Sequence, residues 1–517
     1  MPGNDNNKGR NAVNASSTIA ALLERGEAGR PAIRASEGRA GLTHAGLRDL
    51  AAVTVARLNA IGIGRNDRVA IVLPNGPEMA TAFLAIAAGA TTAPLNPAYR
   101  AEEFDFYLAD LKARALVVAE GVETPARAAA QKLGITVLEL VPGGAAGRFT
   151  LAGGTQAPAA HPGMATAEDI ALVLHTSGTT ARPKIVPLTQ ANVTASAHHI
   201  GATLMLTPDD ACLNVMPLFH IHGLIAAVLS SIGAGGSVVC TPGFDALKFF
   251  RWLDEERPSW YTAVPTMHQT ILTRASRNEA IIARARLRFI RSSSASLPGP
   301  VMRQMEAVFG APLVESYGMT EASHQMASNP LGGPRKPGLV GLPAGPEIAI
   351  MDDDGAILEQ GAIGEVVIRG PNVTPGYEAN PEANAKAFLH GWFRTGDQGM
   401  LDEDGFLMLT GRLKELINRG GEKVSPLEVD GILSDHPAVA QALTFAIPHA
   451  KLGEEVGAAV VLREGMALTE RELRDFAAKS LADFKVPRKI VFLAEIPKGA
   501  TGKLMRIGLA EKLGIAG

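Results

Sequence analysis

Short apolar runs alternate with amphipathic segments through the middle of the chain. Between residues 237 and 316 the apolar runs SVVCT, WYTAVP, RFIRSS and PLVES are separated by segments predicted to be helical, at 246–256, at 266–274 and from Pro300 onward. This alternation is typical of parallel βαβ units whose sheet is covered by helices. We therefore predict an α/β fold in which residues 1–411 form a large N-terminal domain.

The pattern changes after Gly411. The segments SPLE, at 425–428, and TERE, at 469–472, each place a hydroxyl residue three positions before glutamate, which is the capping-box pattern of a helix N-terminus. The strand-like runs AAVVLR and IVFLAEI flank the second segment. Residues 412–517 are therefore predicted to form a small α+β domain. A Gly-, Ala- and Pro-rich stretch at 143–163 is predicted to be a surface connection rather than a packed element.

The composition favours small-molecule chemistry over nucleic-acid or membrane binding. Of 517 residues, 46% are hydrophobic and 20% are charged, and the formal net charge of −3 provides no basic surface for nucleic acid or anionic lipid. No apolar run approaches the roughly twenty residues of a membrane span. Cys212 and Cys240 stand in no metal-binding spacing, so both are expected to be buried thiols. We expect a cytoplasmic monomer or homodimer with no nucleic-acid partner and no membrane span.

A hydroxyl-rich loop follows the apolar run IALVL, which is predicted to be a buried strand. Hydroxyls, backbone N–H groups and an unhindered glycine can surround phosphate oxygens, and a lysine after Pro183 adds a cation. The loop is not a Walker loop because GxxxxGK[ST] is absent; the alternative is a serine/threonine turn at a strand end. The residues of this predicted ATP-binding loop are Thr176, Ser177, Gly178, Thr179, Thr180 and Lys184.

One lysine near the C-terminus, Lys503 in the segment PKGATGK, lies among small residues. A mobile loop can carry this ammonium group to a reacting phosphate and withdraw it again. There it would stabilise the charge that develops when a carboxylate attacks the phosphate. The alternative is a solvated lysine in a basic tail. Together with the hydroxyl-rich loop, Lys503 predicts the activation of a carboxylate by ATP.

Five strings occur in the order and spacing of the adenylate-forming superfamily, which the chain therefore resembles. They are TSGTTARPK, ESYGMTEA, WFRTGD, GRLKELINRGGEKVSPLEVD and PKGATGK, between residues 176 and 503. The superfamily includes acyl-CoA synthetases, luciferases and peptide-synthetase adenylation domains. Within it, the strings PLFHIHG, WYTAVPT, RFIRSSSASL and IRGPNVTPGY are most similar to those of the oxalate:CoA ligases. The resemblance implies a large AMP-binding (adenylation) domain followed by a small mobile domain.

The resemblance also implies roles for the residues around the nucleotide. Tyr317 would stack on adenine, and Thr320 would contact phosphate. Glu321 would hold Mg²⁺, because a carboxylate beside a triphosphate is repelled unless a divalent cation lies between them. Asp397 and Arg412 would contact the ribose. From the residues alone, Tyr317 could equally be a core aromatic and Asp397 the cap of a turn.

Members of the superfamily perform two reactions in one site by rotating the small domain after the first. The pivot of that rotation matches Lys414. The segment NRGGEKVSP resembles the face that presents the CoA thiol, with Gly420 and Gly421 admitting a narrow pantetheine arm beside Glu422. An ordinary turn before the cap at Ser425 is the alternative, and it is compatible with this role.

Three polar residues match the positions that surround the acyl group in the superfamily. They are His220 in PLFHIHG, Ser294 in RSSSAS and His324 in TEASH. A small diacid needs hydrogen-bond donors for its second carboxylate, and serine or histidine can supply them. The alternative is that each histidine satisfies a buried backbone group.

These observations predict an ATP-dependent acid:CoA ligase. The carboxylate and ATP would give an acyl-adenylate and pyrophosphate, and CoA would then give the thioester and AMP, with oxalate as the favoured acid. A medium-chain fatty or aryl acid:CoA ligase is the first alternative. A catalytically silent nucleotide-binding protein is an alternative of another class. A carrier-loading adenylation domain is less expected because little sequence follows Lys503.

Overall fold

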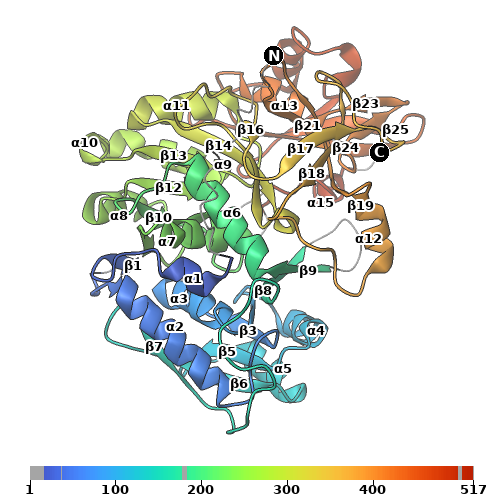
Figure 1. The fold of residues 1–517 in the computed structure, drawn as a ribbon. Helices are drawn as coiled ribbons and strands as arrows, with labels where there is room; N and C mark the ends of the chain where they lie inside the picture. The colour runs from blue at the N-terminus through green and yellow to red at the C-terminus, as the bar shows by residue number, and fades with distance from the viewer. Residues whose placement is uncertain (1–16, 37, 177–182, 499–503, 516–517) are drawn as a thin grey trace, which may run out of the picture.

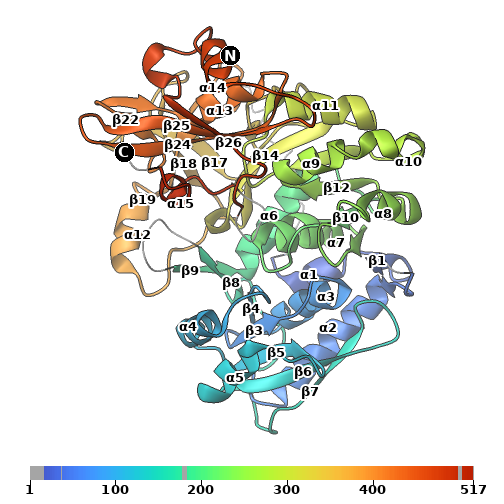
Figure 2. The same cartoon turned by 180° about the vertical axis from the view of Figure 1, so that it is seen from behind.

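The computed structural model describes residues 17–36, 38–176, 183–498 and 504–515. Its strands form four sheets, and the two largest belong to the N-terminal region. The blue and cyan elements of the N-terminal third lie at one end of the molecule, and the orange and red C-terminal elements lie at the other (Figures 1 and 2). The large α/β region predicted from the sequence is present.

The first large sheet has nine strands, and its middle is parallel. In sheet order, every neighbouring pair from β14 (Leu313–Met319) to β1 (Pro31–Ala35) is parallel. The pairs beyond these two strands, at both edges of the sheet, are antiparallel. The four apolar runs at 237–316 supply neighbouring strands of this sheet, as predicted. In sheet order the strands are β16 (Leu342–Pro343), β15 (His324–Ser328), β14 (Leu313–Met319), β13 (Phe289–Ser292), β12 (Trp260–Ala263), β10 (Ala211–Asn214), β11 (Ser237–Cys240), β1 (Pro31–Ala35) and β2 (Leu42–Thr43).

The second large sheet has seven strands and ends in the hairpin that carries the hydroxyl-rich loop. In sheet order these are β7 (Phe149–Ala152), β6 (Thr136–Pro142), β5 (Ala115–Ala119), β3 (Arg68–Val72), β4 (Thr91–Pro94), β8 (Ile170–Thr176) and β9 (Lys184–Thr189). The stretch at 143–163 is not only a surface connection, because β7 pairs with β6 and buries Phe149. Glycines at both ends hid this short strand in the sequence.

Helices pack between and around these sheets. They are α1 (Ile19–Leu23), α2 (His44–Asn59), α3 (Pro77–Ala87), α4 (Ala101–Leu111), α5 (Pro125–Lys132), α6 (Gln190–Thr203), the π-helix η1 (His222–Leu229), α7 (Ser230–Gly233), α8 (Phe249–Glu256), α9 (Pro265–Leu272), η2 (Ala275–Arg277), α10 (Glu279–Arg284), α11 (Gly299–Phe309) and η3 (Thr320–Ala322). No described helix is long and apolar enough to cross a membrane. Cys212 and Cys240 are buried free thiols, as expected.

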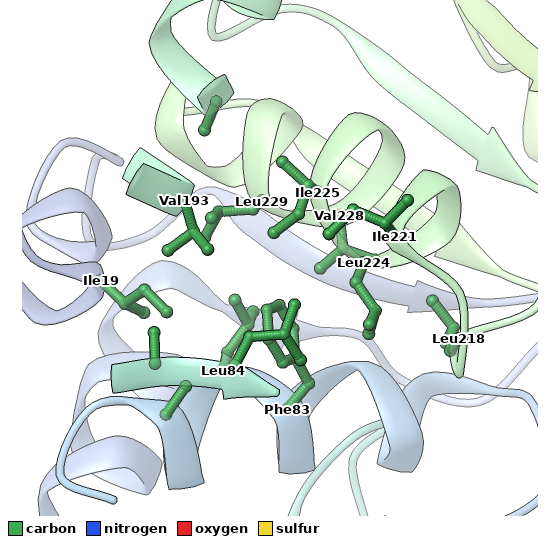
Figure 3. Close-up of a cluster of buried hydrophobic side chains, with 14 of the residues drawn as sticks. Ile19, Phe83, Leu84, Val193, Leu218, Ile221, Leu224, Ile225, Val228 and Leu229 are labelled. Carbon is green, nitrogen blue, oxygen red and sulfur yellow. The ribbon is translucent and has the colours of Figure 1, made fainter. Parts of the chain in front are cut away.

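The π-helix η1 lies at the centre of the largest apolar core. All eight of its residues are buried, and Figure 3 shows Leu224, Ile225 and Leu229 facing Leu84 of α3 and Val193 of α6. A π-helix is rare and frequently marks a functional site. Burial on every side holds the first residue of η1, His222, in a fixed position.

A third sheet lies between the large region and the C-terminal region in sequence. It contains β17 (Glu347–Met351), β18 (Gly364–Arg369), β19 (Phe388–Leu389), β20 (Trp392–Leu401) and β21 (Leu407–Arg412), and α12 (Pro381–Ala387) precedes β19. The antiparallel pairing of β20 with β21 places Asp397 opposite Arg412. The proposed boundary at 411/412 therefore falls at the end of a strand of this sheet.

The C-terminal region forms its own sheet and its own apolar clusters. Its elements are β22 (Ile417–Arg419), β23 (Glu422–Val424), α13 (Pro426–Ser434), β24 (Val439–His449), β25 (Gly453–Leu462), α14 (Glu470–Ala477), η4 (Asp483–Lys485), β26 (Lys489–Phe492) and α15 (Leu509–Lys512). Both predicted helix starts are present. Thr469 forms a complete capping box with Glu472, whereas Ser425 caps α13 alone because the Glu428 carboxylate pairs with Lys485 instead.

Uncharged side chains join the C-terminal sheet to the large region. Gln441 on β24 donates a hydrogen bond to Gln269 Oε1 on α9 (2.8 Å), and Gln269 Nε2 donates to the carbonyl of Ala440 (3.1 Å). Both bonds connect neutral amide or carbonyl groups. They place the C-terminal sheet beside α9, which follows directly on β12.

Candidate active site

The β8–β9 hairpin frames the predicted phosphate loop. Thr176 ends β8 and lies in register with Lys184, which begins β9. Lys184 Nζ lies 4.2 Å from the centre of the Tyr377 ring, so its cation is held over an aromatic face. The remaining predicted loop residues, Ser177, Gly178, Thr179 and Thr180, lie outside the described residues.

Tyr317, Asp397 and Arg412 form one hydrogen-bonded group. The Tyr317 hydroxyl donates to Asp397 Oδ2, and Arg412 Nε pairs with Asp397 Oδ1 at 2.9 Å. Burial and the Asp397 charge raise the pKa of Tyr317, so its hydroxyl keeps its proton. The Asp397 charge also raises the pKa of Arg412. Strand β14 and the β20–β21 pair thus bring together three residues that the sequence assigned to the adenosine site.

Glu321 is a buried carboxylate at the turn η3, which follows β14 directly. The residue is only 6% exposed, and its Oε1 accepts a hydrogen bond of 2.9 Å from the Tyr377 hydroxyl. Desolvation raises the pKa of Glu321. Thr320 is the first residue of the same turn. Tyr377 therefore links Glu321 to Lys184, a connection that the sequence did not reveal although it lies in the quoted string IRGPNVTPGY.

Glu321 fits a magnesium ion that is bound mainly by a triphosphate. Among the described residues no group of three or more His, Cys, Asp or Glu side chains could hold a metal alone. Mg²⁺ commonly takes one or two protein carboxylates and completes its shell with phosphate oxygens and water. A single buried carboxylate beside Thr320 is such a donor set.

His222 connects the three residues predicted to surround the acyl group. Its Nδ1 lies 3.0 Å from Ser294 Oγ, and its ring meets the His324 ring edge-on with 4.9 Å between centroids. His220 Nδ1 accepts a 3.3 Å hydrogen bond from the His222 backbone N–H. The structure thus brings His220, Ser294 and His324 together around a histidine that sequence reasoning passed over, although PLFHIHG contains it.

Backbone strain gathers at the same place. Ser294, Ser323 and His324 have φ angles of 73°, 49° and 99°, in the left-handed region that side chains rarely adopt. A Cβ on Gly318 would lie 1.8 Å from the His324 carbonyl oxygen, so glycine is required opposite this histidine. Strain of this kind persists where the surroundings impose it, and it clusters at functional sites.

A buried arginine lies behind this histidine cluster. Arg291 on β13 is fully buried, and its Nη1 lies 3.3 Å from His222 Nε2 and 3.4 Å from Thr262 Oγ1. Thr262 Oγ1 is 2.6 Å from the same His222 nitrogen. Arg291 Nη2 faces Gln325 Oε1 at 3.4 Å. The charged residue inside the apolar run RFIRSS was the available signal for Arg291, since strands of a parallel sheet interior are usually apolar throughout.

Comparison with known proteins agrees with this geometry. Residues 23–378 match the AMP-binding enzyme family, and residues 428–503 match the AMP-binding enzyme C-terminal domain. The chain belongs to the AMP-binding enzyme family. It is 47% identical to an oxalate–CoA ligase of Arabidopsis thaliana, over 96% of this chain and 98% of that protein. It is 35% identical to a sulfoacetate–CoA ligase of Cupriavidus necator, over 87% of this chain and 88% of that protein.

Solved structures share this fold. The crystal structure of ATP-bound MatB from Rhodopseudomonas palustris aligns with a TM-score of 0.87 at 32% identity, over 96% of this chain and 98% of that one. The two family matches leave residues 379–427 between them. The predicted boundary at 411/412 lies in that interval and stays a prediction.

The residues assigned to domain movement and to the CoA path lie after β21 in the chain, and one of them lies outside the described residues. Lys414 is exposed in the turn that joins β21 to β22. Gly420 and Gly421 form the exposed turn of the β22–β23 hairpin, with φ angles of 62° and 99°, and Glu422 begins β23. Lys503 lies outside the described residues. The turn interpretation of the glycine pair is therefore correct, and the CoA role remains a proposal.

Proposed function

We propose that the protein is an AMP-forming acid:CoA ligase whose acid is oxalate. The carboxylate oxygen attacks the α-phosphorus of ATP and pyrophosphate leaves; the CoA sulfur then attacks the carbonyl carbon and AMP leaves. One observation carries the choice of acid. The side chains around His222 offer hydrogen-bonding groups, not an apolar wall, where the acyl group is expected.

A small acid with a second negative group suits such a cluster. Hydroxyl and imidazole N–H groups can donate to a second carboxylate, whereas a fatty or aryl group offers them no acceptor and places apolar surface against polar groups. The relatives named for oxalate and sulfoacetate support this choice, because each of those acids carries two anionic groups. Medium-chain and aryl acids are accordingly the weaker alternative.

The proposed nucleotide site uses the groups described above. Tyr317 and the Asp397–Arg412 pair would bind the adenosine, and Thr320 with the β8–β9 loop would bind phosphates. Glu321, oriented by Tyr377, would hold Mg²⁺, which when bound neutralises the triphosphate. Lys503 would bring a positive charge to the attacking carboxylate and the α-phosphate.

The proposed reaction has two stages that need different C-terminal surfaces. Lys503 would serve the first stage and withdraw, and the hairpin with Gly420, Gly421 and Glu422 would flank the CoA arm in the second. Lys414 would be the pivot, and its exposed place two residues after the end of β21 supports this role. The order of events follows from the chemistry, since the thiol needs an activated carbonyl.

A pyrophosphate-release assay with a panel of acids tests the proposal. We expect ATP-dependent release with oxalate, and oxalyl-CoA formation once CoA is added. Hexanoate and cinnamate are the matched comparisons for the apolar alternatives. Preference for either of them would replace oxalate, and no release with any acid would favour a silent nucleotide-binding protein.

A further inference from the structure

Arg291 is a buried cation in the interior of the nine-stranded sheet. Its side chain is fully buried, and among the described residues no carboxylate forms an ion pair with it. Its Nε has no hydrogen-bond partner there either. A buried charge is strongly unfavourable unless something compensates it. Burial lowers the pKa of Arg291 to about 9, which still leaves the guanidinium protonated at neutral pH.

The buried carboxyl closest to Arg291 in the sheet register lies on the other face of the sheet. Glu315 on β14 is in register with Ser292, and Arg291 is in register with Val314. Because successive side chains of a strand point to opposite faces, Glu315 and Arg291 are separated by the sheet. Glu315 Oε1 instead accepts from the Leu297 backbone N–H at 2.9 Å. The positive charge therefore remains available on the face that carries His222 and Thr262.

Arg291 also fixes the direction of the hydrogen bonds that lead to Ser294. A guanidinium has only donors, so Thr262 Oγ1 accepts from Arg291 Nη1, and the 3.3 Å contact of the same Nη1 with His222 Nε2 is favourable only when Nε2 carries no proton. The Thr262 hydroxyl then donates its own proton to His222 Nε2, 2.6 Å away. The neutral ring carries its proton on Nδ1 and donates to Ser294 Oγ. The Ser294 hydroxyl is left to donate to a group in the acyl site.

We propose that Arg291 is a positioning residue for substrate choice: through Thr262 and His222 it orients the Ser294 hydroxyl, and its buried charge favours an acid with a second carboxylate. This inference rests on the proposed oxalate:CoA ligase function. An anion arriving beside Ser294 would supply the negative charge that no carboxylate of the described residues provides by pairing with Arg291. A neutral group of the same size would leave the cation uncompensated.

Oxamate provides the probe, because it replaces one carboxylate of oxalate by a neutral amide of nearly the same shape. The experiment measures kcat and KM for oxalate by pyrophosphate release, and the competition constant of oxamate against oxalate. Arg291→Met should raise KM for oxalate more than it lowers kcat. It should reduce the preference for oxalate over oxamate by roughly ten- to a hundredfold, the range for loss of a charged hydrogen-bonding partner.

Three further variants separate positioning from folding. Arg291→Lys keeps the charge and should retain part of the preference. Thr262→Val removes only the hydroxyl of the relay and should lower the preference by about tenfold. Thr92→Val is the matched control, because Thr92 is equally buried in a strand and its hydroxyl donates to the Ala171 carbonyl in the other large sheet. This control should leave the preference unchanged.

The outcomes distinguish the inference from the function on which it rests. If wild-type protein releases no pyrophosphate with oxalate, the proposed function is wrong and the inference falls with it. If wild-type protein prefers oxalate and both Arg291→Met and Thr262→Val keep that preference, or weaken oxalate and oxamate equally, the inference alone is overturned. Should Arg291→Met fail to fold, the Thr262→Val result decides.

Discussion

Ser294 combines a strained backbone with a hydroxyl that faces His222, and substitution can separate the two properties. Alanine removes the hydroxyl and keeps the strain at φ 73°, whereas glycine removes the hydroxyl and relieves the strain. We expect both variants to lose roughly ten- to a hundredfold in kcat/KM for oxalate, because a charged hydrogen bond is lost in each. Ser294→Gly should be more stable than Ser294→Ala by about 1 kcal/mol.

Steady-state kinetics and urea unfolding of the two Ser294 variants check this expectation. Equal activity losses with unequal stabilities assign the kinetic effect to the hydroxyl. An active Ser294→Gly protein would instead show that the serine matters only for backbone shape. Monocarboxylates should gain relative to oxalate in both variants, since they never needed the donor.

Strand β14 carries a buried carboxyl group, Glu315, that should make the free energy of unfolding depend on pH. Burial raises the pKa of Glu315 to about 8, so the folded protein keeps a proton that the unfolded chain releases above the ordinary carboxyl pKa. Its contribution to stability is therefore complete at acid pH and is lost as the pH rises toward about 8. The upper limit is about 1.4 kcal/mol for each pH unit between the two pKa values.

Glu315→Gln is the test of this sign, because the amide oxygen can still accept from the Leu297 N–H and carries no titrating proton. Urea midpoints measured from about pH 5 to about pH 8 should fall less steeply in the variant than in wild type. Parallel slopes would mean that Glu315 ionises normally in the folded protein.

Local sequence patterns predicted individual helices and strands better than they predicted the contacts between them. Helix caps such as Thr469 and strands such as β13 depend on neighbours in sequence, and both were predicted. The strand β7 was not predicted. Its side chains alternate between buried and exposed over only four residues, and this pattern can be recognised only once β6 is known to pair with it. The sequence left two roles open for Gly420 and Gly421, namely an ordinary turn and the CoA path. The hairpin geometry shows the turn and does not test the CoA role.

The same distinction holds for the candidate site. Motif strings located Tyr317, Glu321 and Asp397, and the structure adds the hydrogen bond from Tyr317 to Asp397 and the one that Glu321 accepts from Tyr377. Tyr377 and Arg291 were not singled out, because their importance arises from Glu321 and His222, which lie 56 and 69 positions away. A buried arginine in an apolar strand is a visible anomaly, yet its partner can be found only after the strands have been arranged.

At the scale of the whole molecule, the proposed domain rotation predicts that the two half-reactions can be separated. Lys503→Ala should lower adenylation by roughly a hundredfold or more, the effect expected when one charge partner of a transition state is removed. Thioester formation from supplied acyl-adenylate and CoA should stay near the wild-type rate, because Lys503 has withdrawn by then. Single-turnover measurements of each half-reaction supply the comparison. Equal losses in both would contradict the assignment of Lys503 to the first stage.

The contact between Gln269 and Gln441 bears on how readily the two regions come apart. Both groups are neutral amides, so water can replace each hydrogen bond without exposing or neutralising a charge. Such a contact is indifferent to ionic strength, because screening acts on charges. In the proposed domain rotation, this contact would favour the position of the C-terminal sheet beside α9 and would add little to the barrier for leaving it.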